Sequence, residues 1–141
     1  MFKNILVPVD GSDHALRALD VACDLAQKYG ATLRLVHAYP PIFADSTMGG
    51  ADIEPLIARR TEAGEAVLAR AREYVKDCAL DITTELREAP DAEAILEEAD
   101  AHHCDLIVMG TRGLGRLTGL LLGSVSQKVV QHAKCPVLLV R

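Results

Sequence analysis

The chain is poor in aromatic residues, has no block of basic residues, and has no hydrophobic run long enough to cross a membrane. Only 4% of its 141 residues are aromatic, tryptophan is absent, and the net charge is −5. A nucleic-acid surface needs clustered lysine and arginine, so this composition argues against a nucleic-acid partner. A membrane helix needs about 20 apolar residues, and no run approaches that length. These absences favour an ordinary globular protein without a membrane span.

The sequence also gives little support for export or for disulfide bonds. Its first residues lead directly into an apolar run and lack the layout of a secretory signal peptide. The four cysteines form no CxxC pair and are scattered at Cys23, Cys78, Cys104 and Cys135. We therefore expect reduced thiols and a cytoplasmic location. A single domain over residues 1–141 is expected, because a chain of this length buries a sufficient core without staples.

Apolar runs alternate with helical patterns along the whole chain. Strands are expected at residues 5–9, 32–38, 81–87, 105–109 and 136–140. Helices are expected between Ser12 and Gly30, from near Asp52 to Cys78, from Pro90 past Ala99, and from about Ser124 to His132. This alternation indicates a single-domain α/β fold with a parallel sheet and helices on both faces. The third run alternates apolar and polar residues as an edge strand does, so we expect an open five-stranded sheet of order 3-2-1-4-5.

Two of the expected helices carry apolar stripes at helical spacing. The first stripe comprises Leu16, Leu19, Cys23, Ala26 and Tyr29, and the second comprises Leu56, Ala63, Val67, Ala71, Tyr74 and Cys78. Such stripes predict the faces that pack on the sheet. Ser12 and Gly30 are residue types that begin and end helices, which supports the bounds of the first one.

The expected strand order places a candidate site. The winding of the sheet reverses between the first and fourth strands, and open α/β sheets bind ligands at the carboxyl ends of the strands flanking such a reversal. Asp10 follows the first strand, and a glycine-rich stretch over 109–126 follows the fourth. Topology and composition therefore indicate the same crevice.

The stretch 109–126 has the features of an anion site. It contains five glycines and two arginines between an apolar strand and a helix. Gly110, Gly113 and Gly115 permit positive φ and a close approach of the backbone to a ligand. Gly123 and Ser124 open a helix whose free N–H groups and dipole favour negative charge. We therefore expect an anion or nucleotide to bind there.

Side chains of the same stretch leave two interpretations open. The hydroxyls of Ser124 and Ser126 offer further donors, and Arg112 and Arg116 either reach outer phosphates or are simply solvated. Ser124 and Gln127 also fit a capping box, in which the serine serves only its own helix. Because the connection of about fourteen residues is longer than usual in compact domains, the functional interpretation is favoured.

Asp10 likewise has two interpretations. Its carboxylate accepts hydrogen bonds only, which suits the paired hydroxyls of a ribose. An aspartate in a turn also commonly bonds its own backbone. Beside a phosphate site, the ribose interpretation is favoured.

The sequence shows no recognisable catalytic apparatus. It lacks a P-loop, a GxSxG elbow, a nucleophile with an evident base and a magnesium ligand set. The run 102–105 contains metal-ligand types, but its spacing spreads them over different faces, and no metal site is expected. His14 and His132 are expected on the surface. The run 120–122 is either an interface patch or a hydrophobic lead into the last helix.

Taken together, these residues resemble the universal stress protein family, in its ATP-binding branch. That branch is marked by G-x2-G-x9-G-[ST], which Gly110, Gly113, Gly123 and Ser124 fit. Residues 5–12, 105–110 and 135–140 are also similar to the family, so the resemblance covers essentially the whole chain. It implies an adenine nucleotide alpha hydrolase-like sheet and a homodimer that pairs the C-terminal strands.

The resemblance also implies roles for individual residues. Pro8 and Val9 would lie near the adenine, with Asp10 on the ribose hydroxyls. His37 and Ala38 stand where the family usually has His-Val against the adenine, so the smaller alanine implies a looser contact. Met109 and Gly110 would line the nucleoside pocket. The implied phosphate ligands are Gly113, Gly123, Ser124, Val125 and Ser126, with Arg112 nearby. The glycine that often precedes the next helix is missing at 88–91, which affects a turn rather than the site.

The implied function is a cytoplasmic, ATP-binding stress-response regulator, dimeric, with slow ATP hydrolysis at most. A companion Mg²⁺ or Mn²⁺ ion is left open, as is the downstream protein partner. Two alternatives remain. One is an adenylating or ATP-hydrolysing enzyme of the PP-loop-like class, whose Ser-Gly-Gly-x-Asp-Ser differs from residues 10–13 here. The other is a nucleotide-free dimerisation module, as in family branches without the glycine pattern.

Overall fold

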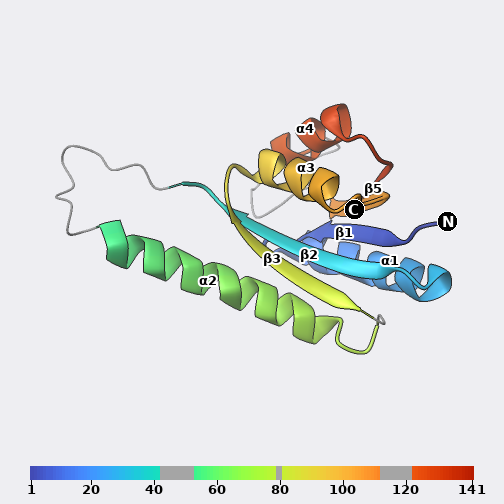
Figure 1. Cartoon of the computed structure of the whole chain (residues 1–141), viewed down its shortest axis with the longest axis horizontal. Coiled ribbons are helices and arrows are strands. Elements are labelled where there is room, and N and C mark those ends of the chain that lie inside the picture. Colours follow the sequence, from blue (N-terminus) through green and yellow to red (C-terminus); the bar gives the residue numbers. More distant parts are fainter. Residues whose placement is uncertain (42–52, 79–80, 112–121) are drawn as a thin grey trace.

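Strands and helices alternate along the chain (Figure 1), for which a computed structural model describes residues 1–41, 53–78, 81–111 and 122–141. The strands are β1 (Asn4–Pro8), β2 (Thr32–Tyr39), β3 (Ile82–Glu88), β4 (Leu106–Gly110) and β5 (Val137–Val140). The helices are α1 (Asp13–Tyr29), α2 (Ile53–Tyr74), α3 (Asp91–Ala101) and α4 (Ser124–His132). No helix in the described ranges has the length and apolar character needed to cross a membrane.

The five strands form one parallel sheet in the order β3-β2-β1-β4-β5, as the sequence predicts. The apolar strands β1 and β4 lie inside the sheet and are covered on both faces, with Ile5, Leu6, Ile107 and Val108 fully buried. The alternating strand β3 lies at one edge and is only partly buried. Burial on two faces requires continuous apolar sequence, whereas an edge strand tolerates polar residues.

The helices form two layers, one on each face of the sheet (Figure 1). Ile5 and Val7 of β1 share a core cluster with residues of α1 and α2. Leu6, between them, belongs to a second cluster with residues of α3 and α4. This division follows from the period of two in a strand, which sends successive side chains to opposite faces.

Helix α1 begins and ends as its sequence predicts. The Ser12 hydroxyl oxygen accepts a hydrogen bond of 3.2 Å from the N–H of Ala15. Gly30 ends the helix at φ 65°, a left-handed conformation that favours glycine. The predicted stripe is wrong at its end, because Tyr29 is 45% exposed.

The buried face of α2 also differs from the predicted stripe. Gly64 and Leu68 are buried, whereas Ala63 and Tyr74 are exposed. A Cβ at position 64 would lie 2.5 Å from Cδ1 of Leu86, so the missing side chain lets α2 approach β3. Close packing at a glycine is not visible in a pattern of apolar residues.

The expectation of four reduced thiols is wrong for two of them. Cys23 of α1 and Cys78, in the turn after α2, form a disulfide with a Cα–Cα distance of 5.4 Å. The two cysteines are 55 residues apart in sequence, and only the packing of both helices on one face brings them together. Cys104 and Cys135 are free, and burial raises the pKa of the Cys104 thiol to about 11.

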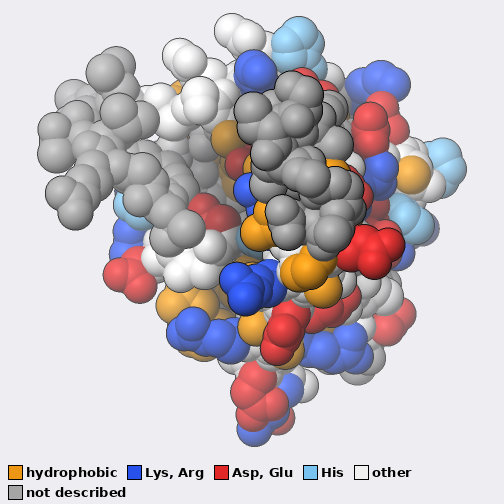
Figure 2. Space-filling view, turned by 90° about the vertical axis from the view of Figure 1, so that its left-hand side faces the viewer, with side chains coloured by type: hydrophobic (Ala, Val, Ile, Leu, Met, Phe, Trp, Pro, Cys, Tyr) orange, Lys and Arg blue, Asp and Glu red, His pale blue; other side chains and the backbone are white. Residues whose placement is uncertain are grey.

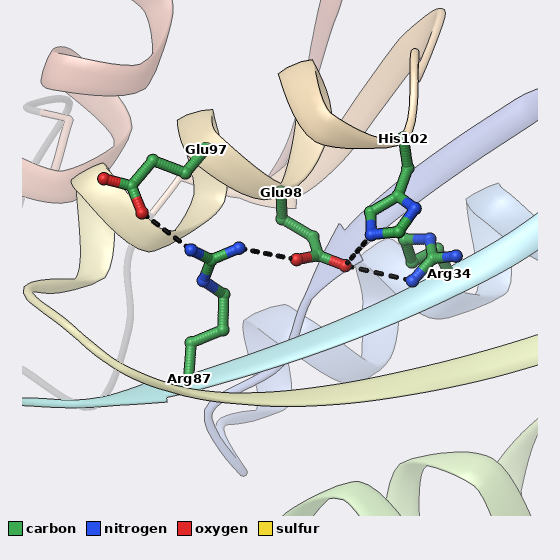
Figure 3. Close-up of polar contacts among 5 residues, drawn as sticks. All are labelled: Arg34, Arg87, Glu97, Glu98 and His102. Carbon is green, nitrogen blue, oxygen red and sulfur yellow. Dashed lines mark hydrogen bonds and ion pairs between the residues drawn. The ribbon is translucent and has the colours of Figure 1, made fainter.

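A buried carboxylate ties α3 to the edge of the sheet (Figure 3). Glu98, 1% exposed, accepts hydrogen bonds of 3.0 Å from Arg34 of β2 and 2.9 Å from Arg87 of β3. Arg87 also pairs with Glu97, and His102 lies 3.3 Å from Glu98. Removing one partner would leave a buried charge uncompensated, so the network fixes α3 over β2 and β3.

Candidate functional site

A cavity of about 430 Å³ opens at the carboxyl ends of β1, β2 and β4. Ten predicted site residues line it: Pro8, Val9, Asp10, Ala38, Met109, Gly110, Gly123, Ser124, Val125 and Ser126. The other two, Arg112 and Gly113, lie outside the described residues, as do Arg116 and most of the run 120–122. Figure 2 shows the side of the molecule toward which these strand ends point, where acidic and basic side chains are interspersed.

Asp10 follows β1 and is held by the turn that leads into α1. Its Oδ1 accepts a hydrogen bond of 2.9 Å from the N–H of Ser12, and Gly11 between them has φ 84°. Asp10 therefore bonds its own backbone through Oδ1, as the turn interpretation predicts. Oδ2 has no partner among the described residues, so one carboxylate oxygen can still accept hydrogen bonds in the cavity.

The N-terminus of α4 forms the opposite wall. Gly123 is the N-cap and makes no side-chain cap bond, so Ser124 is not the cap that the alternative capping-box interpretation requires. The first intrahelical bond runs from the N–H of Gln127 to the carbonyl of Gly123, at 3.0 Å. The N–H groups of 124–126 precede it and have no acceptor within the helix. This arrangement, reinforced by the helix dipole, is suited to an anion.

The two serines of α4 differ. The Ser126 hydroxyl is buried and donates to the carbonyls of Gly110, at 3.0 Å, and Thr111, at 3.1 Å. It therefore ties α4 to the end of β4, and only its N–H remains for a ligand. Ser124 is exposed, and its hydroxyl has no partner among the described residues.

The cavity also contains His37, which the resemblance places beside the adenine together with Ala38, and residues that the sequence prediction omitted: Ser12, Ala15, Val36, Pro40, Asp91 and Ile95. The Nδ1 atom of His37 lies 2.7 Å from the carbonyl oxygen of Val9. Because a carbonyl only accepts, Nδ1 carries the proton and Nε2 is left for other contacts. His37 lies beside Ala38 near the carboxyl end of β2, as the resemblance implies.

Asp91 adds a second carboxylate to the cavity. It is the first residue of α3 and lies exposed at the cavity mouth. Partial burial raises the pKa of its carboxyl. The nearby His37 opposes this rise, while Asp10 and Glu93 add to it. The sequence contained a signal for this position. Asp91 closely follows β3, and the carboxyl ends of parallel strands lie at the same edge of a sheet.

The run 102–105 has ordinary structural contacts. His102 lies beside Glu98, and the Asp105 carboxylate accepts hydrogen bonds from the N–H groups of Lys3, at 2.8 Å, and Asn4, at 3.1 Å. Within the described ranges, no group of three or more His, Cys, Asp or Glu residues is arranged to hold a metal ion.

Comparison with known proteins identifies the family. The model of the universal stress protein family matches residues 1–141. The chain belongs to this family. A universal stress protein of Thermus aquaticus is 50% identical over 141 residues and is covered completely, as is this chain. One from Methanocaldococcus jannaschii is 32% identical, with 100% of this chain and 83% of the relative covered.

Solved universal stress protein structures have the same fold. UspA from Lactobacillus plantarum superposes with a TM-score of 0.83 at 30% identity, covering 99% of this chain and 98% of the other. A universal stress protein solved in complex with cAMP has a TM-score of 0.73 at 32% identity, with 99% and 97% covered. The family and fold that the sequence motifs predict are therefore confirmed.

Proposed function

We propose that this universal stress protein binds ATP in the cavity at the carboxyl ends of β1, β2 and β4. One observation carries the proposal: the acceptor carboxylate of Asp10 and the uncapped N-terminus of α4 line the same cavity. A ribose needs acceptors and phosphates need N–H donors. The structural relative in complex with cAMP supports an adenine nucleotide as the ligand.

The proposed orientation follows the chemistry of the two walls. The base lies against Pro8, Val9 and Ala38, and Asp10 accepts from the ribose hydroxyls through Oδ2. The phosphates lie on the N–H groups of 124–126, with the Ser124 hydroxyl as a further donor. Met109 and Gly110 line the nucleoside part. Arg112 and Gly113 are predicted to complete the phosphate site, with or without Mg²⁺ or Mn²⁺.

We also propose a regulatory, stress-response role, in which ATP is held and at most slowly hydrolysed. The sequence offers no P-loop and no nucleophile with an evident base. Multiple-turnover release of phosphate or pyrophosphate at ordinary enzyme rates would instead favour the PP-loop-like alternative. The cytoplasmic location stays a prediction, and the disulfide removes one of its supports, since reducing compartments disfavour such bonds.

A homodimer through β5 is part of the proposal. This strand lies at the outer edge of the sheet, and Leu138 on it and Val130 on α4 are 38% and 46% exposed. Unpaired strand edges favour pairing with another chain. We expect sedimentation to give a dimer, and Leu138→Asp to shift it toward monomer. A monomer at all concentrations would contradict this part.

The ATP proposal is tested by thermal unfolding with increasing ATP, AMP and GTP. ATP at a hundred times its Kd should add about 2.7 kcal/mol to the free energy of unfolding. Asp10→Ala and Gly123→Val should remove this gain. The backbone at Gly123, with φ −64° and ψ 159°, accepts a valine without strain.

Asp13→Ala is the matched control, because Asp13 is exposed on the first turn of α1 and lies outside the cavity lining. It should keep the full ATP response. If no adenine nucleotide stabilises the protein, the nucleotide-free dimerisation module becomes the better interpretation. If ATP stabilises all three variants equally, the site lies elsewhere.

A further inference from the structure

A second cavity, of about 500 Å³, lies between α1 and α2 on the other side of the β1–α1 turn. Its walls are mostly apolar and include Leu16 and Leu19 of α1 and Val67 and Ala71 of α2. The volume is in the range of small-molecule sites, which are typically apolar with few polar groups. Of the described residues proposed to contact ATP, Val9 alone lines it.

Two of the long polar side chains around this cavity have partners among the described residues, and the third, Arg70, does not. The Tyr74 hydroxyl donates to Oδ1 of Asp20 at 2.9 Å. Glu73 pairs with Lys76 at 2.8 Å. Arg70 lines the same cavity, is exposed, and has no ion pair or hydrogen bond with any described residue. A mostly apolar cavity therefore carries a guanidinium whose donors are not used by any part of the chain that the structure describes.

We propose that this second cavity binds a small molecule with an apolar chain and a single carboxylate. The chain occupies the space between α1 and α2, and the carboxylate pairs with Arg70. A planar guanidinium matches a carboxylate with two parallel hydrogen bonds. Glu73 lines the same rim and repels a doubly charged head group. The balance of charge thus favours a monoanion over a phosphate.

Two direct links join the helices beside the second cavity. The disulfide joins Cys23 of α1 to Cys78 just beyond α2, and the Tyr74–Asp20 hydrogen bond joins the helices closer to the cavity. Helix α2 otherwise packs mainly on β2 and β3. A cavity held open by such links needs little reorganisation on binding, which favours affinity.

Decanoate is the probe, with 1-decanol and decylammonium as matched ligands of the same chain length. Binding is followed by the methyl resonances of alanine in full-length, oxidised protein. Ala15, Ala69 and Ala71 line the second cavity, whereas Ala94 and Ala99 belong to the core under α3. We expect saturable shifts at the first three, with decanoate binding more tightly than decanol and decylammonium binding least.

Variants test the two parts of the proposed site. Arg70→Gln should weaken decanoate binding about tenfold and leave decanol unchanged, as expected for loss of a charge-assisted pair. Arg72→Gln, a neighbouring exposed position outside the cavity lining, is the control and should bind as the wild type does. Ala69→Phe, at an exposed position on the cavity wall, should block all three ligands while the helix content stays unchanged.

Three results would overturn the proposal. One is the absence of saturable shifts at Ala15 and Ala71. Another is a uniform response that includes Ala94 and Ala99, as nonspecific partitioning gives. The third is an equal effect of Arg70→Gln and Arg72→Gln on decanoate affinity. None of these measurements depends on nucleotide, so failure here and failure of the ATP proposal are distinguishable.

Discussion

The two cavities share one wall and are otherwise unlike. Val9, Ser12 and Ala15 line both. The first cavity is made mainly by strand ends and the N-terminus of α4, so its polar groups are backbone N–H groups and short side chains, namely carboxylates, serine hydroxyls and the imidazole of His37. The second is made mostly by the sides of two helices, so its walls are mostly apolar, and its guanidinium, which has no partner within the described ranges, is carried on the long side chain of Arg70. Strand ends present backbone chemistry, whereas helix faces present only what their side chains supply.

Removing the disulfide should give the largest difference between the two cavities in ligand binding. Cys23→Ser with Cys78→Ser, or reduction by dithiothreitol, should lower the free energy of unfolding by about 2–4 kcal/mol, because the bond closes a long loop. Decanoate affinity should fall, since the bond links the walls of the second cavity, while ATP binding persists. Denaturant unfolding and calorimetry measure both effects. Cys135→Ser is the control, because Cys135 is free. An equal loss of affinity for decanoate and for ATP would contradict this difference between the cavities.

The two serines of α4 should have different roles in the first cavity, Ser126 in stability and Ser124 in ATP binding. Ser126→Ala removes a buried hydroxyl that bonds two carbonyls, and should cost about 1–2 kcal/mol of stability. Ser124→Ala should change stability by less than about 0.5 kcal/mol, as expected for an exposed side chain. Its ATP affinity should nevertheless fall several-fold. Urea unfolding and calorimetry test the pair. The opposite order of stability would mean that Ser124 serves as the cap after all.

The shared wall should couple the two ligands. A ligand that shifts Ser12 or Ala15 alters both cavities, so saturating decanoate should change the Kd of ATP. Linkage requires that ATP change the Kd of decanoate by the same factor. We expect a factor of about two to five, or up to about 1 kcal/mol. Calorimetric titration in both orders measures it. Unequal factors would show that one ligand binds at a further site.

Asp91 should give the smallest effect, one that depends on pH. Its folded-state pKa is raised above its unfolded value, by partial burial first. Its contribution to stability is therefore complete below the unfolded pKa and is lost as pH rises through the folded pKa. Above that pKa the carboxylate also repels a triphosphate. Asp91→Asn should strengthen ATP binding about two- to threefold at pH 7.5, with little change for adenosine. The gain should shrink at pH 4, and a gain independent of pH would exclude a charge effect.

Local sequence was enough for the strands, the order of the sheet and one wall of the first cavity. Ser12 and Gly30 mark the ends of α1 by their own chemistry, and Asp10 follows an apolar strand directly. These features depend on neighbours in sequence. The same kind of pattern suggested Ser124 as a possible N-cap of α4. In the structure the N-cap is Gly123, and Ser124 is the first residue of the helix. A shift of one residue removes a capping box, and the sequence pattern does not resolve it.

What the sequence by itself determined is the chain's alternation of strands and helices, its parallel sheet and the crevice at the reversal, because each rests on periodicity and on residue types at strand ends. Only the tertiary structure decided the partner of Cys23, the hydrogen bonds of Ser126 to the end of β4 and the cavity beside Arg70. Each of these joins residues from separate elements. The packing of helices on a sheet fixes such distances, and no local pattern encodes them.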